Sequence, residues 1–516
     1  MSTLSLGIIV IIYMFALALL GYFGYRQTKG ASDFLLGNRK MNPFLVALSY
    51  GATFISASAI VGFGGVSATF GMGIQWLCML NMLMGVIVAF IFFGRRTRSI
   101  GARNNAQTFP QFLGFHFNSR GIQIFVATVI FLGMPLYAAV VMKGGAVFIE
   151  QLFGIDYHIA LLAFTLIVAA YVITGGIKGV LYTDALQAVI MFACMLLLLF
   201  LFYNKIGMGF TEANRELTNM ADLVPERFKA LGHQGWTAMP VTGSPQWYTL
   251  VTSLILGVGI GCLAQPQLVV RFMMVDSAKQ LNRGILIGCL FIFITVGTIY
   301  HLGALSNVFF MKEDGKVAAD MIGDMDKIIP LFISRVTPGW FSAVFMLCIL
   351  SASMSTLSAQ YHTMGAAFGS DAFPKLARKN NPNSSVGIRI GVLIAILASY
   401  VICYTLSAGI IARGTALFMG VCAATFLPVY FCILYWKNVT RQGALASLWT
   451  GLFTFSFCML FLHKAEAAPI GVCKALFGRD VLIDVYPWFM IDPILFALPL
   501  SVIVLVVVSK LTRKKA

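Results

Sequence analysis

The chain contains thirteen apolar segments, each long enough to cross the hydrocarbon core of a membrane. A helix needs about 20 apolar residues to span a core about 30 Å thick. With 59% hydrophobic and only 11% charged residues among 516, no soluble packing would cover this apolar surface, since soluble domains carry about 25% charged residues. We therefore expect an all-α polytopic protein of the plasma (inner) membrane, with the lipid bilayer as its surroundings. The segments lie near residues 4–24, 43–71, 74–94, 122–149, 158–174, 180–203, 248–270, 284–309, 339–369, 387–410, 412–436, 442–463 and 486–509.

Other features argue against several classes of protein. The net charge is +17, but Lys and Arg occur in scattered clusters, which does not favour nucleic-acid binding. The ten Cys residues stand singly, mostly within apolar segments, so a disulfide framework is not predicted. The sequence contains no HExxH, GxSxG or Walker motif, so we expect neither an enzyme nor an ATP-driven pump. No small-residue cleavage site follows the first segment, which we interpret as a retained helix.

The charges also predict how the chain crosses the membrane. Lys and Arg gather in the cytoplasmic loops of membrane proteins. If the N-terminus is extracellular, most of the 36 Lys and Arg residues fall in cytoplasmic loops and most of the 19 acidic residues fall outside. We expect an N-out, C-in topology, with the long loop 204–247 outside the cell.

Two spans are interrupted by small and helix-breaking residues. The segment Ser49–Gly65 is rich in hydroxyl groups and glycine, and the segment Gly257–Arg271 combines clustered glycines with Pro266. One alternative is close helix packing through small residues. However, the two segments each begin a group of five spans, and an odd number inverts the second group relative to the first. Inverted repeats with broken first helices are typical of secondary transporters that bind solute near the middle of the membrane.

This spacing predicts the domain organisation. We expect a first helix and cytoplasmic loop at 1–42, a first repeat at 43–203, an extracellular loop at 204–247, a second repeat at 248–436, and two additional helices with a basic tail at 437–516.

Several polar residues lie deep within the predicted spans. Ser351, Ser355 and Ser358 follow one another at helical spacing, with Thr356 beside them, and hydroxyl oxygens suit a hard cation such as Na⁺. The alternative is hydrogen bonding between helices. Asp184 lies near the start of the sixth span, where a carboxylate is expensive and indicates function unless it caps the helix or pairs with Lys178.

Four segments resemble sequences of the sodium/solute symporter family, and the resemblance extends from the first span to the eleventh. It implies a leucine-transporter-like fold with a five-plus-five inverted repeat, and Na⁺-coupled symport by alternating access. The matching segments are Phe34–Lys40, Gly175–Gln187, Arg271–Lys279 and Ala352–Ser358.

The same resemblance implies two positions for sodium. The first uses backbone carbonyls at the break of the second span together with backbone and hydroxyl oxygens of the ninth. These ligands fall on Ala52, Ile55, Ala352, Ser355 and Thr356. A second position, present in some members, falls on Asp184, Ser355 and Ser358, although Ala359 stands where the family pattern has a serine.

The predicted solute site combines the two breaks with one lysine. Phe54, Ser58 and Ala59 differ from the residues of proline-type and sugar-type members, and the local sequence resembles the pantothenate and monocarboxylate branch. We therefore expect a small monocarboxylate as the solute. The alternatives are a proline-type amino acid or a sugar, coupling to H⁺, or a channel or sensor on this scaffold.

The second break adds Gln265 and Gln267 as predicted solute ligands. Lys143 lies deep in the fourth span, where its ammonium would compensate a carboxylate, reach towards the membrane surface, or pair with an acid. No obligate protein partner is evident.

Overall fold

The computed structural model describes residues 3–26, 35–39, 41–174, 177–275, 281–372 and 385–513. Within these ranges the backbone is helical, apart from connecting segments and an isolated bridge between Met41 and Val275. Parts of three family-like segments lie outside the described residues, namely Phe34, Lys40, Gly175, Gly176 and residues 276–279.

Each of the thirteen predicted spans coincides with helical structure. Among the described residues, ten helices are long and apolar enough to cross a membrane, two further spans are bent pairs, and α9 provides a shorter apolar helix. The spans of the first half are α1 (Thr3–Arg26), α3 (Pro43–Phe54) with η2 (Ser58–Gly62) and α4 (Phe63–Phe70), α5 (Gln75–Leu80) with η4 (Asn81–Gly94), α8 (Arg120–Phe153), α9 (Tyr157–Thr174) and α10 (Ile177–Ile206). Those of the second half are η6 (Tyr248–Gly257) with α14 (Val258–Gly261), η7 (Cys262–Ala264) and α15 (Pro266–Met273), α17 (Arg283–Ile292) with η8 (Phe293–Gly297) and α18 (Thr298–Asp314), α21 (Gly339–Ala366) with η10 (Ala367–Ala372), α23 (Ser385–Thr405), α24 (Ile411–Thr425) with α25 (Leu427–Tyr435), α26 (Arg441–Phe461) and α29 (Ile494–Leu511).

Shorter helices connect these spans. They are η1 (Gly37–Arg39), η3 (Met72–Ile74), α6 (Arg95–Arg103), α7 (Phe109–His116), α11 (Phe210–Asn219), η5 (Met220–Leu223), α12 (Glu226–Lys229), α13 (Pro245–Trp247), α19 (Ala318–Met321), η9 (Met325–Lys327), α20 (Ile328–Val336), α27 (Lys464–Ile470), α28 (Val472–Phe477) and η11 (Trp488–Met490).

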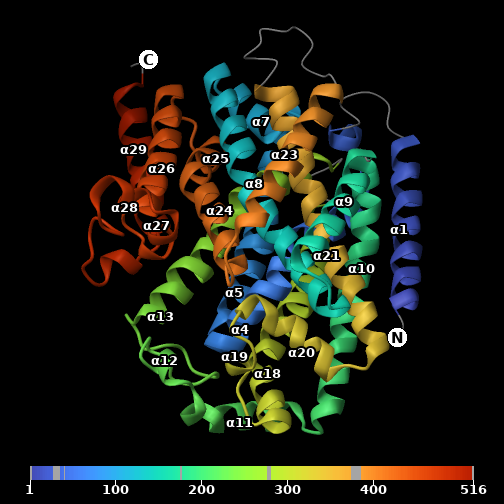
Figure 1. Ribbon diagram of the computed structural model, residues 1–516. Coiled ribbons are helices and arrows are strands. Elements are labelled where there is room, and N and C mark those ends of the chain that lie inside the picture. Colours follow the sequence, from blue (N-terminus) through green and yellow to red (C-terminus); the bar gives the residue numbers. More distant parts are fainter. Residues whose placement is uncertain are drawn as a thin grey trace.

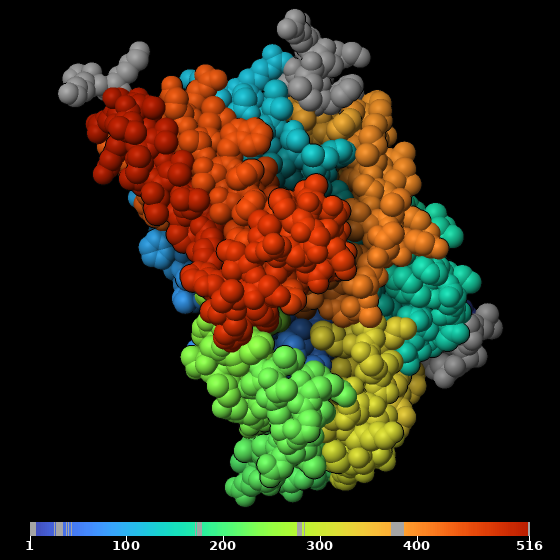
Figure 2. Space-filling view, turned by 60° about the vertical axis from the view of Figure 1, so that its left-hand side comes forward, coloured from blue at the N-terminus to red at the C-terminus, as the bar shows by residue number. Residues whose placement is uncertain are grey.

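The two ends of the chain lie at opposite ends of the helical bundle, as the N-out, C-in topology requires (Figure 1). Helices α11, α12, α19 and α20 lie at the end where the N-terminus is found, which is the extracellular side. In the space-filling view the same green and yellow segments form a lobe below the bundle (Figure 2).

Local sequence explains where the central helices begin and end. The side chain of Asn42 accepts a hydrogen bond from the Phe44 N–H at 2.9 Å, and Pro43 follows at the first helical position, so α3 starts there. Ser119 caps α8 in the same way. Gly154, with a φ of +64°, ends α8 in the left-handed conformation that glycine adopts without strain.

Helix α21 lies at the centre of the protein and α1 at its edge. In the apolar window of α21, 89% of the residues are buried, against 17% in α1. Helix α21 packs against α3, α8 and α10, whereas α26 and α29 pack mainly on each other and lie on the opposite flank from α1 (Figure 1). The hydroxyl-rich ninth span therefore lies where an ion could be held away from lipid.

Candidate sodium and solute site

The first break separates α3 from η2, and the two helical parts of this span are bent by 51°. Ile55 leaves the helix with an extended conformation (φ −90°, ψ 110°). The N–H groups of Ala59 and Ile60 donate to the Ser56 carbonyl at 3.0 and 3.3 Å, so the usual helical donor to Ile55 is redirected. The Ile55 carbonyl is thereby left outside the helical ladder and can serve another partner.

Two hydroxyls of α21 meet the carbonyl oxygens at this break. Ser355 Oγ donates to the Ala52 carbonyl at 2.8 Å and lies 3.3 Å from that of Ala352. Thr356 Oγ1 donates to the Thr53 carbonyl at 3.0 Å. All five residues are buried, and their oxygens are the type of ligand that a hard cation takes. The structure thus brings together Ala52, Ala352, Ser355 and Thr356, with Ile55 at the adjoining break.

Asp184 lies on the cytoplasmic side of these oxygens, in the second turn of α10. Its Oδ2 accepts from Ser49 Oγ at 2.5 Å, from Thr53 Oγ1 at 3.4 Å and from Arg271 Nη2 at 2.9 Å. Both charged side chains are buried, with 0% and 1% exposure. Ser358 donates to the Ser355 carbonyl at 3.0 Å, within its own helix.

The sequence analysis did not identify Arg271 as the partner of Asp184. Arg271 follows the apolar run after Pro266, and the requirement that an intramembrane carboxylate have a charged partner was the signal that could have found it. The sequence does not show that the two side chains are close in space, because they are 87 residues apart along the chain.

The second break mirrors the first in the other repeat. After η7, Gln265 adopts an extended conformation (φ −68°, ψ 119°), and Pro266 is the first residue of α15. Gly261 just before it allows close packing, because a Cβ there would lie 2.3 Å from the Met419 carbonyl oxygen of α24. Gln267 Nε2 donates to Gln265 Oε1. Among the described residues, Gln265 Nε2 and Gln267 Oε1 are buried without a hydrogen-bond partner.

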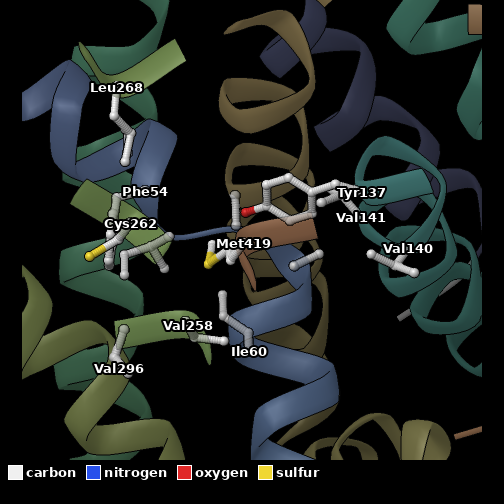
Figure 3. Packing of buried hydrophobic residues seen from close by; sticks show 14 of the residues in the cluster. Phe54, Ile60, Tyr137, Val140, Val141, Val258, Cys262, Leu268, Val296 and Met419 are labelled. Carbon is white, nitrogen blue, oxygen red and sulfur yellow. The ribbon is translucent and has the colours of Figure 1, made fainter. Parts of the chain in front are cut away.

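Apolar side chains surround the two breaks. The ring of Phe54 stacks on Tyr50 with 6.4 Å between ring centroids, and its edge faces Gly85. Ser58 is buried with its hydroxyl unpartnered in the described part of the chain, while Ala59 is half-buried. In Figure 3, Phe54 of α3, Cys262 of η7 and Leu268 of α15 lie on one side, and Tyr137, Val140 and Val141 of α8 lie on the other. Ile60, Val258 and Met419 lie between these two groups.

Lys143 lies beside the first break, but its ammonium is held on the extracellular side. A Cβ at the next residue, Gly144, would lie 3.1 Å from Ala57, so α8 packs directly on the break. Lys143 Nζ donates to the carbonyls of Leu406 (3.3 Å) and Ser407, in the loop between α23 and α24. A role as solute ligand remains a prediction for this residue.

Asp326, which the sequence analysis did not identify, is a buried carboxylate in the same extracellular region. Asp326 of η9 is buried, and burial together with the neighbouring Asp324 carboxylate raises its pKa to about 7. The Lys143 ammonium and the N–H groups of Ile411 and Ile410 at the start of α24 act in the opposite direction on this pKa.

Comparison with known sequences decides the family. Residues 34–451 match the profile of the sodium:solute symporter family. The chain belongs to the sodium:solute symporter family. Members of this family are transporters, so the protein is a Na⁺-coupled symporter of a small organic solute and an integral multi-pass membrane protein, not an enzyme.

Two bacterial relatives cover most of this symporter. The high-affinity proline transporter PutP of Bacillus subtilis (strain 168) is 26% identical over 443 residues, which are 84% of this chain and 88% of that protein. The sodium/proline symporter of Salmonella typhimurium (strain LT2) is 27% identical over 449 residues, which are 86% and 85% of the two chains.

Solved structures share the fold of this symporter. A Na⁺-coupled sialic acid symporter, in a substrate-bound outward-open state, superposes with a TM-score of 0.77 at 17% identity, covering 99% of this chain and 98% of that one. Mhp1, a nucleobase-cation-symport-1 family transporter in a closed conformation, superposes with a TM-score of 0.56 at 14% identity, covering 94% and 96%. The predicted leucine-transporter-like fold is confirmed.

Proposed function

We propose that this symporter uses the Na⁺ gradient to take up a small amino acid of the proline type, bound between the two breaks. The observation that carries the proposal is the pair of unpartnered amide atoms at the second break, Gln265 Nε2 and Gln267 Oε1. Burying an amide donor or an amide acceptor without a hydrogen-bond partner costs free energy, which a ligand that forms the missing hydrogen bonds would recover.

An amino acid zwitterion matches this pair. Its carboxylate accepts from the Gln265 amide, and its protonated amine donates to the Gln267 oxygen. The start of α15 at Pro266 adds the positive end of a helix dipole near the carboxylate. The apolar side chains around the breaks suit the hydrocarbon body of such a solute, and the names of the relatives, both proline transporters, support this class.

A monocarboxylate, the class expected from the sequence, is the second candidate. The observation in its favour is the charge balance: Arg271 already neutralises Asp184, so an anionic solute would balance the charge of an incoming Na⁺. Such a solute would engage Gln265 and leave Gln267 without a partner.

For the ion, we propose that Na⁺ binds to the carbonyl oxygens of Ala52, Ile55 and Ala352 and the hydroxyl oxygens of Ser355 and Thr356. These hydroxyls donate to carbonyls at the break in the present structure, and would turn their lone pairs to the ion. An ion held there joins α3 to α21 and favours the conformation in which the adjoining solute site is formed. The difference in Na⁺ affinity between conformations supplies the coupling.

Uptake of radiolabelled solutes into proteoliposomes, with and without a Na⁺ gradient, tests the proposal. The decisive pair is proline and cyclopentanecarboxylate, which share a five-membered ring and a carboxylate but differ in the amine. We expect Na⁺-driven uptake of proline, and an increase of KM of about tenfold or more for Gln267→Leu, because a hydrogen bond to a charged group contributes about 1.5–3 kcal/mol.

Gln246→Leu is the matched control, since the buried Gln246 amide also lacks a side-chain partner among the described residues but lies in α13 at the extracellular end. Uptake of pantothenate or cyclopentanecarboxylate without any uptake of proline or another amino acid would reject the amino acid proposal and favour the monocarboxylate.

A further inference from the structure

The cytoplasmic side of the proposed sodium site contains a cation that belongs to the protein. Arg271 Nη2 lies 2.9 Å from both Asp184 Oδ2 and Thr53 Oγ1, and Ser49 donates to the same carboxylate oxygen. A carboxylate with two hydroxyls at short range is a set of oxygens that would suit Na⁺. Here a guanidinium nitrogen occupies the centre of that set.

The guanidinium differs from a sodium ion in two ways. It is attached to α15 and cannot dissociate, and arginine keeps its charge throughout the physiological range. Asp184 is therefore neutralised whether or not Na⁺ is present. A second Na⁺ at Asp184 would place two cations on one buried carboxylate, where repulsion is poorly screened.

Thr53 connects this ion pair to the proposed sodium site. Its carbonyl accepts from Thr356 Oγ1, one of the proposed Na⁺ ligands, at 3.0 Å. Its hydroxyl accepts from Arg271 and lies 3.4 Å from the Asp184 carboxylate. A shift of Thr53 when Na⁺ binds would thus change the contact between α3 and α10 of one repeat and α15 of the other.

We propose that Arg271 serves as a tethered internal cation in place of a second Na⁺, so that the symporter binds one Na⁺ per cycle, and that Thr53 is the positioning residue that transmits Na⁺ binding to the Arg271–Asp184 pair. The proposal rests on the Na⁺ site described under the proposed function, but it does not depend on which solute is transported.

Binding of ²²Na⁺ to the purified full chain counts the ions without any solute. The wild type should bind one Na⁺ per chain with a Hill coefficient near 1. Arg271→Gln should expose Asp184 to solvent cations, raising the count to two and the Hill coefficient above 1. The neutral double variant Asp184→Asn, Arg271→Gln should return the count to one, and Arg271→Lys, which keeps the charge, should also bind one.

The matched control is Arg413→Gln, because Arg413 forms a 2.8 Å ion pair with Glu466 away from the sodium site. This variant should leave the count at one. Two ions bound to the wild type would overturn the proposal, as would a count of one in folded Arg271→Gln. If Arg271→Gln does not fold, the wild-type count alone decides, and a chain that binds no Na⁺ rejects both this proposal and the site beneath it.

Two substitutions of Thr53 test whether it transmits Na⁺ binding to the Arg271–Asp184 pair or only supports the fold. Thr53→Val removes the hydroxyl but keeps the shape, and should raise the Na⁺ concentration for half-maximal binding about fivefold or more. Thr53→Ser keeps the hydroxyl and should bind Na⁺ like the wild type. Equal Na⁺ affinity of the Val variant and the wild type would reject the role of Thr53.

Discussion

The two sides of the proposed sodium site are closed by different chemistry. On the cytoplasmic side, which we term the inner layer, the buried side chains of Arg271 and Asp184 pair directly, with Ser49 and Thr53 completing the contacts. On the extracellular side, the outer layer, Lys143 donates to backbone carbonyls of the loop before α24, and Asp324 Oδ1 accepts from the Gly409 N–H at 3.0 Å.

The difference shows which layer can respond to the ion. In the inner layer two full charges are buried, and the carbonyl of one residue of the network, Thr53, accepts from the hydroxyl of the proposed Na⁺ ligand Thr356. In the outer layer Lys143 contacts a loop backbone, and the ion pair of that layer, Lys327 Nζ to Glu150 Oε1 at 2.7 Å, is partly exposed. Close backbone packing accompanies it, since a Cβ at Gly65 of α4 would lie 2.1 Å from the Met325 carbonyl oxygen of η9. We infer that Na⁺ acts first on the inner layer, whereas the outer layer depends on how η9 and the loop pack.

The largest effect is expected from Asp184→Asn in the inner layer. This change leaves the Arg271 guanidinium buried without a carboxylate, and breaking such a pair costs about 3–5 kcal/mol. The melting temperature in detergent should fall clearly and uptake should be nearly lost. Adding Arg271→Gln should recover much of the stability. An unchanged melting temperature would mean that the inner layer is no more tightly held than the outer one.

A smaller but specific effect is expected from Ser355→Ala combined with Thr356→Ala, between the two layers. The Na⁺ concentration for half-maximal uptake should rise about tenfold or more, which corresponds to about 1.4 kcal/mol of binding free energy. Ser353→Ala is the control, because its hydroxyl bonds to the Ile349 carbonyl of the same helix at 2.8 Å. Wild-type Na⁺ dependence in the double variant would place the ion elsewhere.

Lys143→Met tests the outer layer and should have a moderate effect. If the ammonium only holds the loop carbonyls of Leu406 and Ser407, uptake should fall a few-fold with unchanged Na⁺ affinity. Kinetics of uptake by this variant and by Lys143→Arg, which should recover most activity, provide the measurement. A much larger loss of uptake in a well-folded Met variant, arising from a higher KM for solute at unchanged Na⁺ affinity, would instead assign Lys143 to the solute site, as the sequence predicted.

The smallest effect concerns the pH dependence of the outer layer. Because the pKa of Asp326 is raised to about 7, the folded state holds a proton between about pH 4 and 7 that the unfolded chain releases. Its contribution to stability is therefore present at low pH and is lost as the pH rises through 7. The melting temperature of the wild type should fall over this range more than that of Asp326→Asn. Parallel pH profiles of the two proteins would show that Asp326 does not titrate there.

Much of the fold followed from the sequence because its signals are local. Hydropathy located thirteen segments that all coincide with helices, and Pro266 with its neighbouring glycines marked one of the two breaks. The family resemblance placed Ala52, Ala352, Ser355 and Thr356 in one predicted site, and the structure brings their oxygens within hydrogen-bonding distance. Their role as Na⁺ ligands stays a prediction. Nothing tests the second ion that the family resemblance placed at Asp184 and Ser358, and the Arg271–Asp184 pair argues against it.

The identity of the solute stays a prediction. The sequence favoured a monocarboxylate from residues of the first break, whereas the relatives and the unpartnered amides of Gln265 and Gln267 support an amino acid. Residue types within one segment do not show that the Gln265 and Gln267 amides lie next to each other with one donor and one acceptor left unpartnered in the described structure.

By itself the sequence determined the membrane class, the topology, the inverted order of the repeats and the two breaks, since each depends on hydrophobicity, charge and helix-breaking residues that act over about 20 positions. The tertiary structure alone decided which charges meet. Arg271 pairs with Asp184, for which the sequence offered Lys178 as a partner, and Lys143 donates to carbonyls of the extracellular loop. Such choices depend on how α3, α8, α10 and α15 pack, and a buried charge is stabilised by whichever partner that packing brings within about 3 Å.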